Sequence, residues 1–327
     1  MAVKPKHRLL RSVSTILLLV LIGLAVVWWQ RNWLYDQIRL YGYNPPAAIA
    51  QLADDAAMTD NARHLYYINR PELKARNLFS DFCPSGTEQT VVLGCYKGGQ
   101  RGIYLLDVTN PELAGIKQVT AAHEMLHAAY QRLSKDDRTY IDGLLWDYYD
   151  KQLSNETLKQ TIDEYKKTEP GELANEMHSI FATQVADLPT ALNTYYQRYF
   201  KDRSKVIAFY AGYEKAFTSR QQQIKAYDTQ LSDWKTQIDT LENALDDSSN
   251  VLASQRSELN QQKKSGNYEV YNAGVDSYNK AVNNHNALLE RLKDLINRYN
   301  EVVKQRNAIA FEEQSLVQSL TAPAAAQ

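Results

Sequence analysis

Cysteine is scarce in this sequence: only Cys83 and Cys95 occur among its 327 residues, and no Cys-x-x-Cys pair is present. A zinc site built from cysteine thiolates is therefore not indicated, because such sites use closely spaced pairs. The two cysteines flank Pro84-Ser85-Gly86 and the apolar run Val91-Val92-Leu93. They predict a disulfide that pins a loop to a strand in an oxidising compartment. The alternative is a pair of reduced and buried thiols.

An excess of basic residues is also missing. The chain carries 37 Lys and Arg residues against 38 Asp and Glu residues, which gives a net charge of -1. Because phosphate binding depends on basic side chains that release counterions, no nucleic-acid partner is expected. Phenylalanine is rare, with 7 residues against 22 tyrosines. Amphipathic tyrosine rings suit half-buried surfaces such as helix seams and grooves.

Charged residues are absent from residues 12–29, an apolar run of 18 residues that ends in Trp28-Trp29. This length lies at the lower end of what spans a bilayer, and tryptophans suit the membrane interface. The run follows four basic residues, Lys4, Lys6, Arg8 and Arg11. Since basic flanks stay in the cytoplasm, we expect an uncleaved anchor with the chain after about residue 30 outside. A cleaved signal peptide is the alternative, but no small-x-small cleavage site follows the run.

The most specific chemical signal is the pentapeptide His123-Glu124-Met125-Leu126-His127. On a helix, residues four apart lie on the same face, so both imidazoles reach one metal ion while Glu124 stands beside them. The flanking residues predict a helix over 116–133, because apolar residues recur there at three- and four-residue spacing without Pro or Gly. The alternative is a surface helix with two solvated histidines.

Upstream of this helix the sequence predicts a small sheet. A short helix is expected over 47–58, and strands are expected over 64–68, 90–96 and 102–108. The last two are separated by Lys97-Gly98-Gly99-Gln100, a composition typical of a hairpin turn.

A small sheet, a helix with His-Glu-x-x-His and a later helix that supplies a glutamate resemble the gluzincin group of zinc metallopeptidases. The resemblance covers about residues 60 to 200. It implies that His123 and His127 bind zinc, that Glu124 is the general base, and that a glutamate from the later helix completes the site. The metzincin extension, with a glycine and a third histidine soon after the motif, is absent.

The third zinc ligand is expected on a helix over 172–183, which follows predicted helices over 134–153 and 155–168. Glu176 lies 176 - 127 = 49 residues past His127 and forms an Asn-Glu pair that resembles several gluzincin ligand helices. Glu172 resembles the alternative Glu-x-x-x-Asp pattern, except that Asn175 stands where that pattern has Ala. We favour Glu176 as the ligand and keep Glu172 as the alternative. The remaining glutamate would then orient a histidine, unless both acids simply face water.

Four further residues are candidates for a role near the transition state. On a helix His178 points away from Glu176, so we expect a structural or oxyanion-stabilising role for it. Gluzincins usually supply a Tyr or His donor to the tetrahedral intermediate, and several tyrosines follow in the sequence without any one being selected: Tyr195, Tyr196 and Tyr199.

From about residue 203 proline is absent until Pro323, and heptad spacing of apolar residues runs from Tyr210 to Leu259 and from Tyr271 to Val303. The two segments flank Ser265-Gly266-Asn267 and predict an antiparallel helical hairpin, with Leu241 or Leu245 near Leu289 and Leu292. An arm of some sixty residues would extend on the order of 90 Å. His285 at a seam position is expected to set register and not to bind a metal.

These observations predict an α+β, mostly α fold with a zinc-metallopeptidase-like domain and a long coiled-coil hairpin. The expected parts are a basic cytoplasmic tail at 1–11, a transmembrane anchor at 12–29, the gluzincin-like domain at 30–202, the hairpin at 203–320 and a disordered tail at 321–327. The predicted function is extracytoplasmic, zinc-dependent hydrolysis of a peptide or protein substrate. The alternative is a non-catalytic scaffold that binds a cell-envelope partner through its coiled coil.

Overall fold

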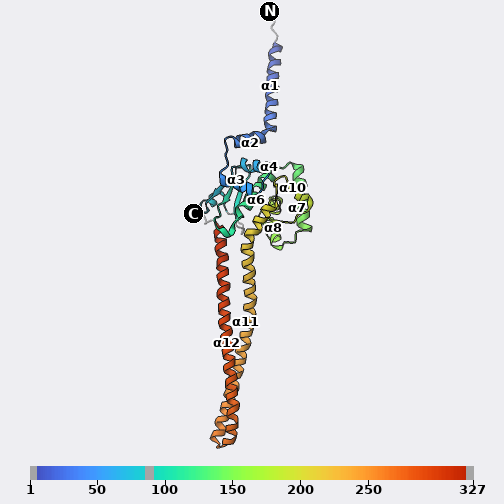
Figure 1. Ribbon diagram of the computed structural model, residues 1–327. Helices are drawn as coiled ribbons and strands as arrows, with labels where there is room; N and C mark the ends of the chain where they lie inside the picture. The colour runs from blue at the N-terminus through green and yellow to red at the C-terminus, as the bar shows by residue number, and fades with distance from the viewer. Residues whose placement is uncertain (1–5, 85–91, 322–327) are drawn as a thin grey trace, which may run out of the picture. The chain divides into compact units, whose positions relative to one another are not determined.

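The computed structural model describes residues 6–84 and 92–321 and is 77% helical. The chain divides into two compact units, one comprising Met1–Glu214 with Ser319–Gln327 and the other Lys215–Gln318 (Figure 1). The expected boundary at 202/203 lies just before the first long helix, α11 (Ser204–Lys264). The first turns of α11 therefore belong to the first unit.

The sheet of the first unit has the strand order β1-β3-β2. Strands β2 (Gly94–Lys97) and β3 (Gly102–Leu106) are antiparallel, with Cys95 opposite Tyr104, which confirms the predicted hairpin. Its turn contains Gly99 and Gln100, both with positive φ, as tight hairpin turns require. Strand β1 (Glu72–Lys74) pairs parallel to β3 and was not expected, because three residues are too few to show alternation. Residues 90 and 91 of the expected strand lie outside the described residues.

The strand expected over 64–68 is wrong, because these residues form the end of helix α4 (Asp60–Ile68). Thr59 caps this helix by accepting a hydrogen bond from the backbone N–H of Ala62. The buried residues Ala62, Leu65 and Tyr66 follow helical spacing. The aromatic run is too short by itself to separate a strand from a helix, and the helical period is visible only from the capping threonine onward.

Helix α6 (Ile116–Gln131) carries the histidine motif and lies at the centre of the first unit. The predicted helix is confirmed, and it begins after Gly115, whose φ is +101°. A Cβ at Gly115 would lie 2.9 Å from the carbonyl oxygen of Phe209, so this close approach requires glycine. A short 3-10 helix, η1 (Pro111–Leu113), precedes the start of α6. Helix α6 packs against strands β2 and β3 and against helices α3 (Ala47–Asp55), α4 and α9 (Leu173–Gln184).

The helices predicted after the motif are confirmed. They are α7 (Lys135–Lys151), α8 (Glu156–Thr168) and α9. Ser134 and Asn155 cap α7 and α8 by accepting hydrogen bonds from the backbone N–H groups of Asp137 and Leu158. Two shorter helices complete the unit, α5 (Arg76–Phe82) and α10 (Thr190–Tyr196).

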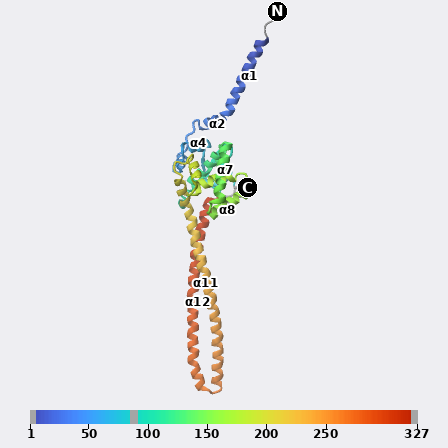
Figure 2. The same ribbon diagram turned by 90° about the vertical axis from the view of Figure 1, so that its right-hand side faces the viewer.

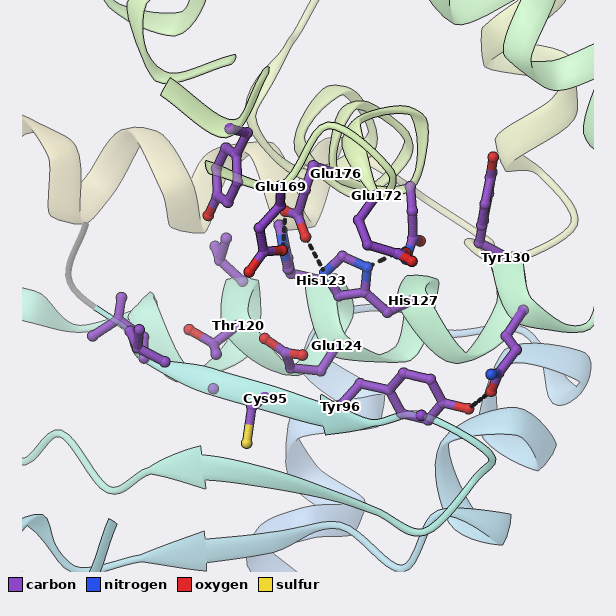
Figure 3. A pocket seen from close by; sticks show the side chains of 18 of the residues that line it. Cys95, Tyr96, Thr120, His123, Glu124, His127, Tyr130, Glu169, Glu172 and Glu176 are labelled. Carbon is purple, nitrogen blue, oxygen red and sulfur yellow. Dashed lines mark hydrogen bonds and ion pairs between the residues drawn. The ribbon is translucent and has the colours of Figure 1, made fainter. Parts of the chain in front are cut away.

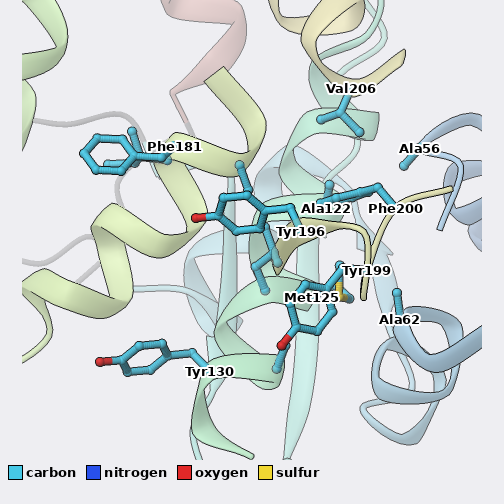
Figure 4. Close-up of a cluster of buried hydrophobic side chains, with 14 of the residues drawn as sticks. Ala56, Ala62, Ala122, Met125, Tyr130, Phe181, Tyr196, Tyr199, Phe200 and Val206 are labelled. Carbon is cyan, nitrogen blue, oxygen red and sulfur yellow. The ribbon is translucent and has the colours of Figure 1, made fainter. Parts of the chain in front are cut away.

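One hydrophobic core holds these helices together, and it is rich in aromatic rings (Figure 4). Met125 and Ala122 of α6 share this core with Tyr196 of α10 and Phe200. All four side chains are at most 2% exposed, so the motif helix is fixed on its inner side. Burial of such side chains is the main stabilising term for a domain of this size.

The apolar run near the N-terminus lies in helix α1 (Lys6–Trp29), and α2 (Arg31–Leu40) follows it. Among the described residues no single helix has the length and hydropathy of a membrane span, whereas Thr15–Trp29 and Arg31–Leu40, bent by 64°, reach that threshold together.

The second unit is the predicted antiparallel hairpin, formed by α11 and α12 (Tyr268–Leu320), as Figures 1 and 2 show. The turn contains Gly266, whose φ of +78° suits glycine. Leu241 and Leu245 share one apolar cluster with Leu289 and Leu292, which confirms the predicted register. The seam residue His285 accepts or donates a hydrogen bond with Ser248 at 3.2 Å, in line with a register-setting role.

Candidate metal centre

Helices α6 and α9 bring His123, His127 and Glu176 together in one cluster (Figure 3). The two imidazoles project from successive turns of α6 toward α9, and their ring centres lie 4.7 Å apart. His123 Nε2 lies 3.6 Å from one carboxylate oxygen of Glu176, and His127 Nε2 lies 3.5 Å from the other. All three potential ligand atoms lie within 4.8 Å of one another.

These separations fit a shared tetrahedral ion. Zinc binds histidine nitrogen and carboxylate oxygen at about 2.0–2.2 Å, so two ligand atoms at a tetrahedral angle lie roughly 3.3–3.6 Å apart. The two histidine-to-glutamate distances, which join different oxygens of Glu176, lie in this range. A site with three protein ligands also leaves a fourth position for water or substrate, as catalytic zinc sites do.

His127 is held from behind by helix α9. Its Nδ1 lies 3.0 Å from Oδ1 of Asn175 and 3.3 Å from the hydroxyl oxygen of Ser179. The amide Nδ2 of Asn175 donates to the Glu172 carboxylate at 3.0 Å. Since a carboxylate only accepts, the Asn175 oxygen must face His127, and Nδ1 of His127 must carry the proton. Nε2 is then the nitrogen that remains available for a metal ion, and it lies on the side of Glu176.

The structure thus separates the two candidate glutamates. Glu176 lies against both imidazoles, whereas Glu172 is the residue before α9 and contacts the cluster only through Asn175. This chain of hydrogen bonds is the arrangement that orients a ligating histidine in metal sites. Glu172 lines the same cavity but does not belong to the ligand cluster.

Glu124 lies between α6 and strand β2, beside the histidine pair (Figure 3). It is 5% exposed, and its carboxylate accepts a hydrogen bond from the backbone N–H of Tyr96. Burial raises the pKa of Glu124 to about 7, and Glu176 adds to this, whereas His127 and the Tyr96 N–H lower it. A carboxyl group with a pKa near neutrality both accepts and returns a proton, as general acid–base catalysis requires.

Gly94 allows strand β2 to come this close. A Cβ at position 94 would lie 2.6 Å from Cγ2 of Thr120 and 2.9 Å from Cγ and Oε1 of Glu124. The next residue, Cys95, forms the predicted disulfide with Cys83, with the two Cα atoms 5.8 Å apart. The predicted disulfide is therefore confirmed. It fixes strand β2 at Cys95, between Gly94 and Tyr96, the two residues that contact Glu124.

The cluster lies in a cavity of about 640 Å³ between α6, α8, α9 and β2. Four tyrosines line it, namely Tyr96, Tyr130, Tyr165 and Tyr213. The tyrosines expected as donors do not line it, because Tyr195, Tyr196 and Tyr199 lie in the aromatic core. Their sequence position near α9 is not enough to place them in the site, since α10 turns its rings inward.

His178 also lies in this core and is completely buried. Its Nε2 lies 3.1 Å from the hydroxyl oxygen of Tyr195, and its ring packs against four tyrosines. Burial, together with smaller contributions from His127 and His123, lowers the pKa of His178 to about 3, so the ring is neutral. Of the two roles expected for His178, these contacts support the structural one.

Asn175, Gly94 and Tyr96 are among the residues of this site to which the sequence assigned no role. In the sequence, Asn175 stands out only as a mismatch to the Glu-x-x-x-Asp pattern. An amide side chain next to a ligand glutamate could, however, have indicated a hydrogen-bond partner for a ligand histidine. Gly94 carries no local signal, because its role depends on a residue 30 positions later in the chain (124 - 94 = 30).

Comparison with protein families, with curated proteins and with solved structures finds no match to this chain.

Proposed function

We propose that the first unit is a zinc-dependent peptidase of the gluzincin type, with Glu124 as its general base. The observation that carries the proposal is the convergence of His123, His127 and Glu176 in a cavity that also contains the buried carboxyl of Glu124. Metal ligands alone would also fit a structural site. A hydrolytic site needs, besides the three ligands, a free coordination position and a nearby group that accepts a proton, and the buried carboxyl of Glu124 meets the second need.

In this proposal the Nε2 atoms of His123 and His127 and the carboxylate of Glu176 hold the zinc ion. When bound, zinc supplies Lewis-acid polarisation of a carbonyl and lowers the pKa of water. Glu124 accepts the proton of the attacking water and returns it to the leaving amine. Tyr96 and Gly94 keep the Glu124 carboxyl in place, and Asn175 keeps His127 in the ligating tautomer.

The location proposed for this activity is the extracytoplasmic face of a membrane. The apolar residues of α1, with basic residues before them, support an anchor whose N-terminus is cytoplasmic. The Cys83–Cys95 disulfide supports an oxidising compartment for the first unit. The proposed substrate is a peptide or protein segment that enters the 640 Å³ cavity.

Metal analysis combined with a cleavage assay tests the proposal. The full chain should purify with about one zinc ion, and His123→Ala or His127→Ala should remove it, because a three-ligand site fails without one ligand. Glu124→Gln should keep the metal and lose cleavage of a peptide library. Glu169→Gln, at another glutamate that lines the cavity, is the matched control and should keep both.

The hairpin of the second unit favours a second role as an arm that binds an envelope partner. The two helices of the hairpin pack against each other through an apolar cluster of their own, formed by Ile238, Leu245, Leu292 and Leu295. Full zinc content with no cleavage of any peptide, in the unmodified chain and in Glu124→Gln alike, would leave this scaffold role as the remaining function.

A further inference from the structure

One face of helix α2 is held by hydrogen bonds to the rest of the first unit. The hydroxyl of Tyr35 donates to the carbonyl oxygen of Gln100 at 2.8 Å, and Nε of Arg39 donates to the carbonyl oxygen of Ile68 at 2.8 Å. Gln100 lies in the turn between β2 and β3, and Ile68 is the last residue of α4, so this side of α2 is covered by backbone of the first unit.

The buried carboxylate of Asp36 adds a further contact between α2 and the rest of the first unit. Asp36 is 6% exposed and forms an ion pair with Arg132, the residue that caps the C-terminal end of α6, and a second with His64 at 3.0 Å. A buried ion pair of this kind fixes geometry, because the loss of either partner leaves an unpaired buried charge. Helix α2 is therefore connected to the helix that carries His123 and His127.

The opposite face of α2 is apolar and uncovered. Trp33 is 57% exposed, Ile38 is 71% exposed and Tyr41, just after the helix, is 88% exposed. Residues 33, 37, 38 and 41 lie on one side of a helix, opposite Tyr35, Asp36 and Arg39. Asp36 is the only acid of α2, so the outer face carries no negative charge.

The chemistry of this face fits a lipid headgroup region. Tryptophan and tyrosine with aliphatic neighbours are the side chains that concentrate at the boundary between hydrocarbon and water. The exposed face continues into Trp28 and Trp29 and then into α1, whose aliphatic side chains from Ile16 to Val27 are 51–62% exposed. The two helices are bent by 64° relative to each other, so α2 does not continue in the direction of α1.

Charge complementarity points the same way. Arg31 begins α2, and two more exposed arginines lie on the segments that hold it. The guanidinium of Arg70 donates to the carbonyl oxygen of Arg39, and Arg101 follows Gln100 in the hairpin turn. Arg31, at the start of α2, is thus the basic residue on this helix that can attract anionic lipid headgroups, and Arg70 and Arg101 add exposed positive charge on the neighbouring segments.

We propose that α2 lies in the headgroup layer of an anionic bilayer through Trp33, Ile38 and Tyr41, and that the Asp36–Arg132 pair holds the metal centre in a fixed orientation to that surface. The occupant of the exposed face is thus the lipid surface itself. This inference rests on the membrane placement proposed for α1, but it does not depend on zinc or on peptidase activity.

A fluorescent label that reports contact with lipid tests the inference in the full chain. Because Cys83 and Cys95 are bonded to each other, a single added cysteine takes the label: Ile38→Cys for α2, Leu19→Cys for α1, or Gln160→Cys as a control. Gln160 is exposed on α8, which lies away from α2 in both views (Figures 1 and 2). The proteins are reconstituted into vesicles of equal parts phosphatidylcholine and phosphatidylglycerol that contain a lipid with a nitroxide near its headgroup.

We expect the nitroxide to cause a several-fold larger loss of emission at position 38 than at position 160. Trp33→Glu should reduce the loss at 38, because it places a charge in the apolar face, and should leave the loss at 19 unchanged. The same charge in Gln160→Glu should have no effect at 38. These readouts need neither metal nor substrate, so they stand apart from the test of peptidase activity.

Three results would overturn the inference. If position 19 is quenched but position 38 behaves like position 160, α1 is in the membrane and α2 is not. If position 38 is shielded from the nitroxide and transfers energy to the same position of another chain, a second copy covers the face. Absence of quenching at both 19 and 38 would overturn the membrane placement of α1 as well.

Discussion

At the scale of single residues, the position of Glu124 depends on the absence of a side chain at Gly94. Thr120 and Glu124 occupy the space that a Cβ at position 94 would need, at 2.6 and 2.9 Å. Contacts this short force either the strand or the carboxyl group to move. A side chain at position 94 would therefore displace Glu124, the proposed general base. It would not displace the ligand cluster, because His123 and His127 point to the other side, toward α9.

We therefore expect Gly94→Ala to lower kcat/KM for peptide cleavage by about tenfold or more, equivalent to ~1.4 kcal/mol of transition-state stabilisation. Zinc content should not change. Gly98→Ala is the matched control, because the nearest atom to a Cβ there is Nε2 of Gln131 at 3.8 Å, an ordinary contact. Steady-state kinetics and metal analysis on both variants decide the matter, and equal kcat/KM values would show that Glu124 tolerates displacement.

The buried His178 predicts a pH dependence of stability. Its pKa of about 3 in the folded chain lies below the ordinary value of 6.5, so the unfolded chain binds more protons between these values. The contribution of His178 to the free energy of unfolding should then fall as the pH falls from about 6.5 toward 3, by about 2 kcal/mol between neutrality and pH 5. The raised pKa of Glu124 contributes with the opposite sign over this range, so the effect of His178 is the difference between the unmodified chain and a His178 variant.

Urea unfolding of the metal-free protein at pH 7 and pH 5 measures this change. His178→Gln should remove the contribution, whatever its effect on overall stability. Tyr195→Phe removes the hydroxyl partner but leaves the burial, so it should keep the pH dependence. If His178→Gln and the unmodified chain lose the same free energy on acidification, His178 is not the responsible group.

At the scale of elements, α9 both supplies one ligand and orients another. Glu176, Asn175 and Ser179 all contact the histidines of α6, and Glu172 holds the Asn175 amide. We expect Asn175→Leu to weaken zinc binding by about 10- to 100-fold, because His127 loses the acceptor that fixes its tautomer.

Glu172→Gln should weaken zinc binding by less, since glutamine still offers an oxygen to the Asn175 amide. Competition against a chelator of known affinity measures both variants. An unchanged affinity in Asn175→Leu would mean that Ser179 alone suffices to orient His127.

The strand β2 is the second element that the site depends on, and its disulfide predicts a coupled loss. Opening the Cys83–Cys95 bond, which joins residues 12 positions apart, should lower the free energy of unfolding by about 3 kcal/mol. Activity should fall in parallel, because the residues on either side of Cys95 position Glu124.

Denaturant titrations and cleavage assays with and without reductant test this coupling. A chain with both cysteines replaced by serine provides the control, because reductant should not affect it. Thiol labelling of protein from its native compartment should find no reactive cysteine before reduction.

Elements with local signals could be predicted from the sequence, and elements defined by distant contacts could not. Helices α7 and α8 have capping side chains, and all three helices α6, α7 and α8 have periodic apolar positions within one window. Strand β1 forms only because β3 offers it a partner, and α4 reads as a strand unless its cap at Thr59 is included. In the site, spacing identifies His123, His127 and Glu124, whereas the positions of Asn175 and Gly94 follow from how α9 and β2 pack on α6.

At the scale of the whole molecule, the two units predict separate responses to mutation. Leu245→Asp places an unpaired charge in the apolar cluster of the hairpin, so it should unfold that unit. Zinc binding by the first unit should persist, because its ligands lie within Met1–Glu214.

Circular dichroism should show a large loss of helix for Leu245→Asp and none for Asn243→Asp, which is exposed on the same helix. Metal analysis of the same samples completes the test. Loss of zinc together with helix in Leu245→Asp would show that the first unit requires the hairpin to fold.

The path of the chain through the hairpin has a consequence for how its length can evolve. The chain leaves the first unit after Glu214 and rejoins it at Ser319, so the hairpin is an insertion with both ends in one unit. Seven residues added to α11 and seven added opposite them in α12 would preserve the heptad phase and extend the hairpin by about 10 Å. An addition to one helix alone would break the pairing of His285 with Ser248. The length of the hairpin can therefore change by equal insertions in α11 and α12, while the contacts of α6 stay the same.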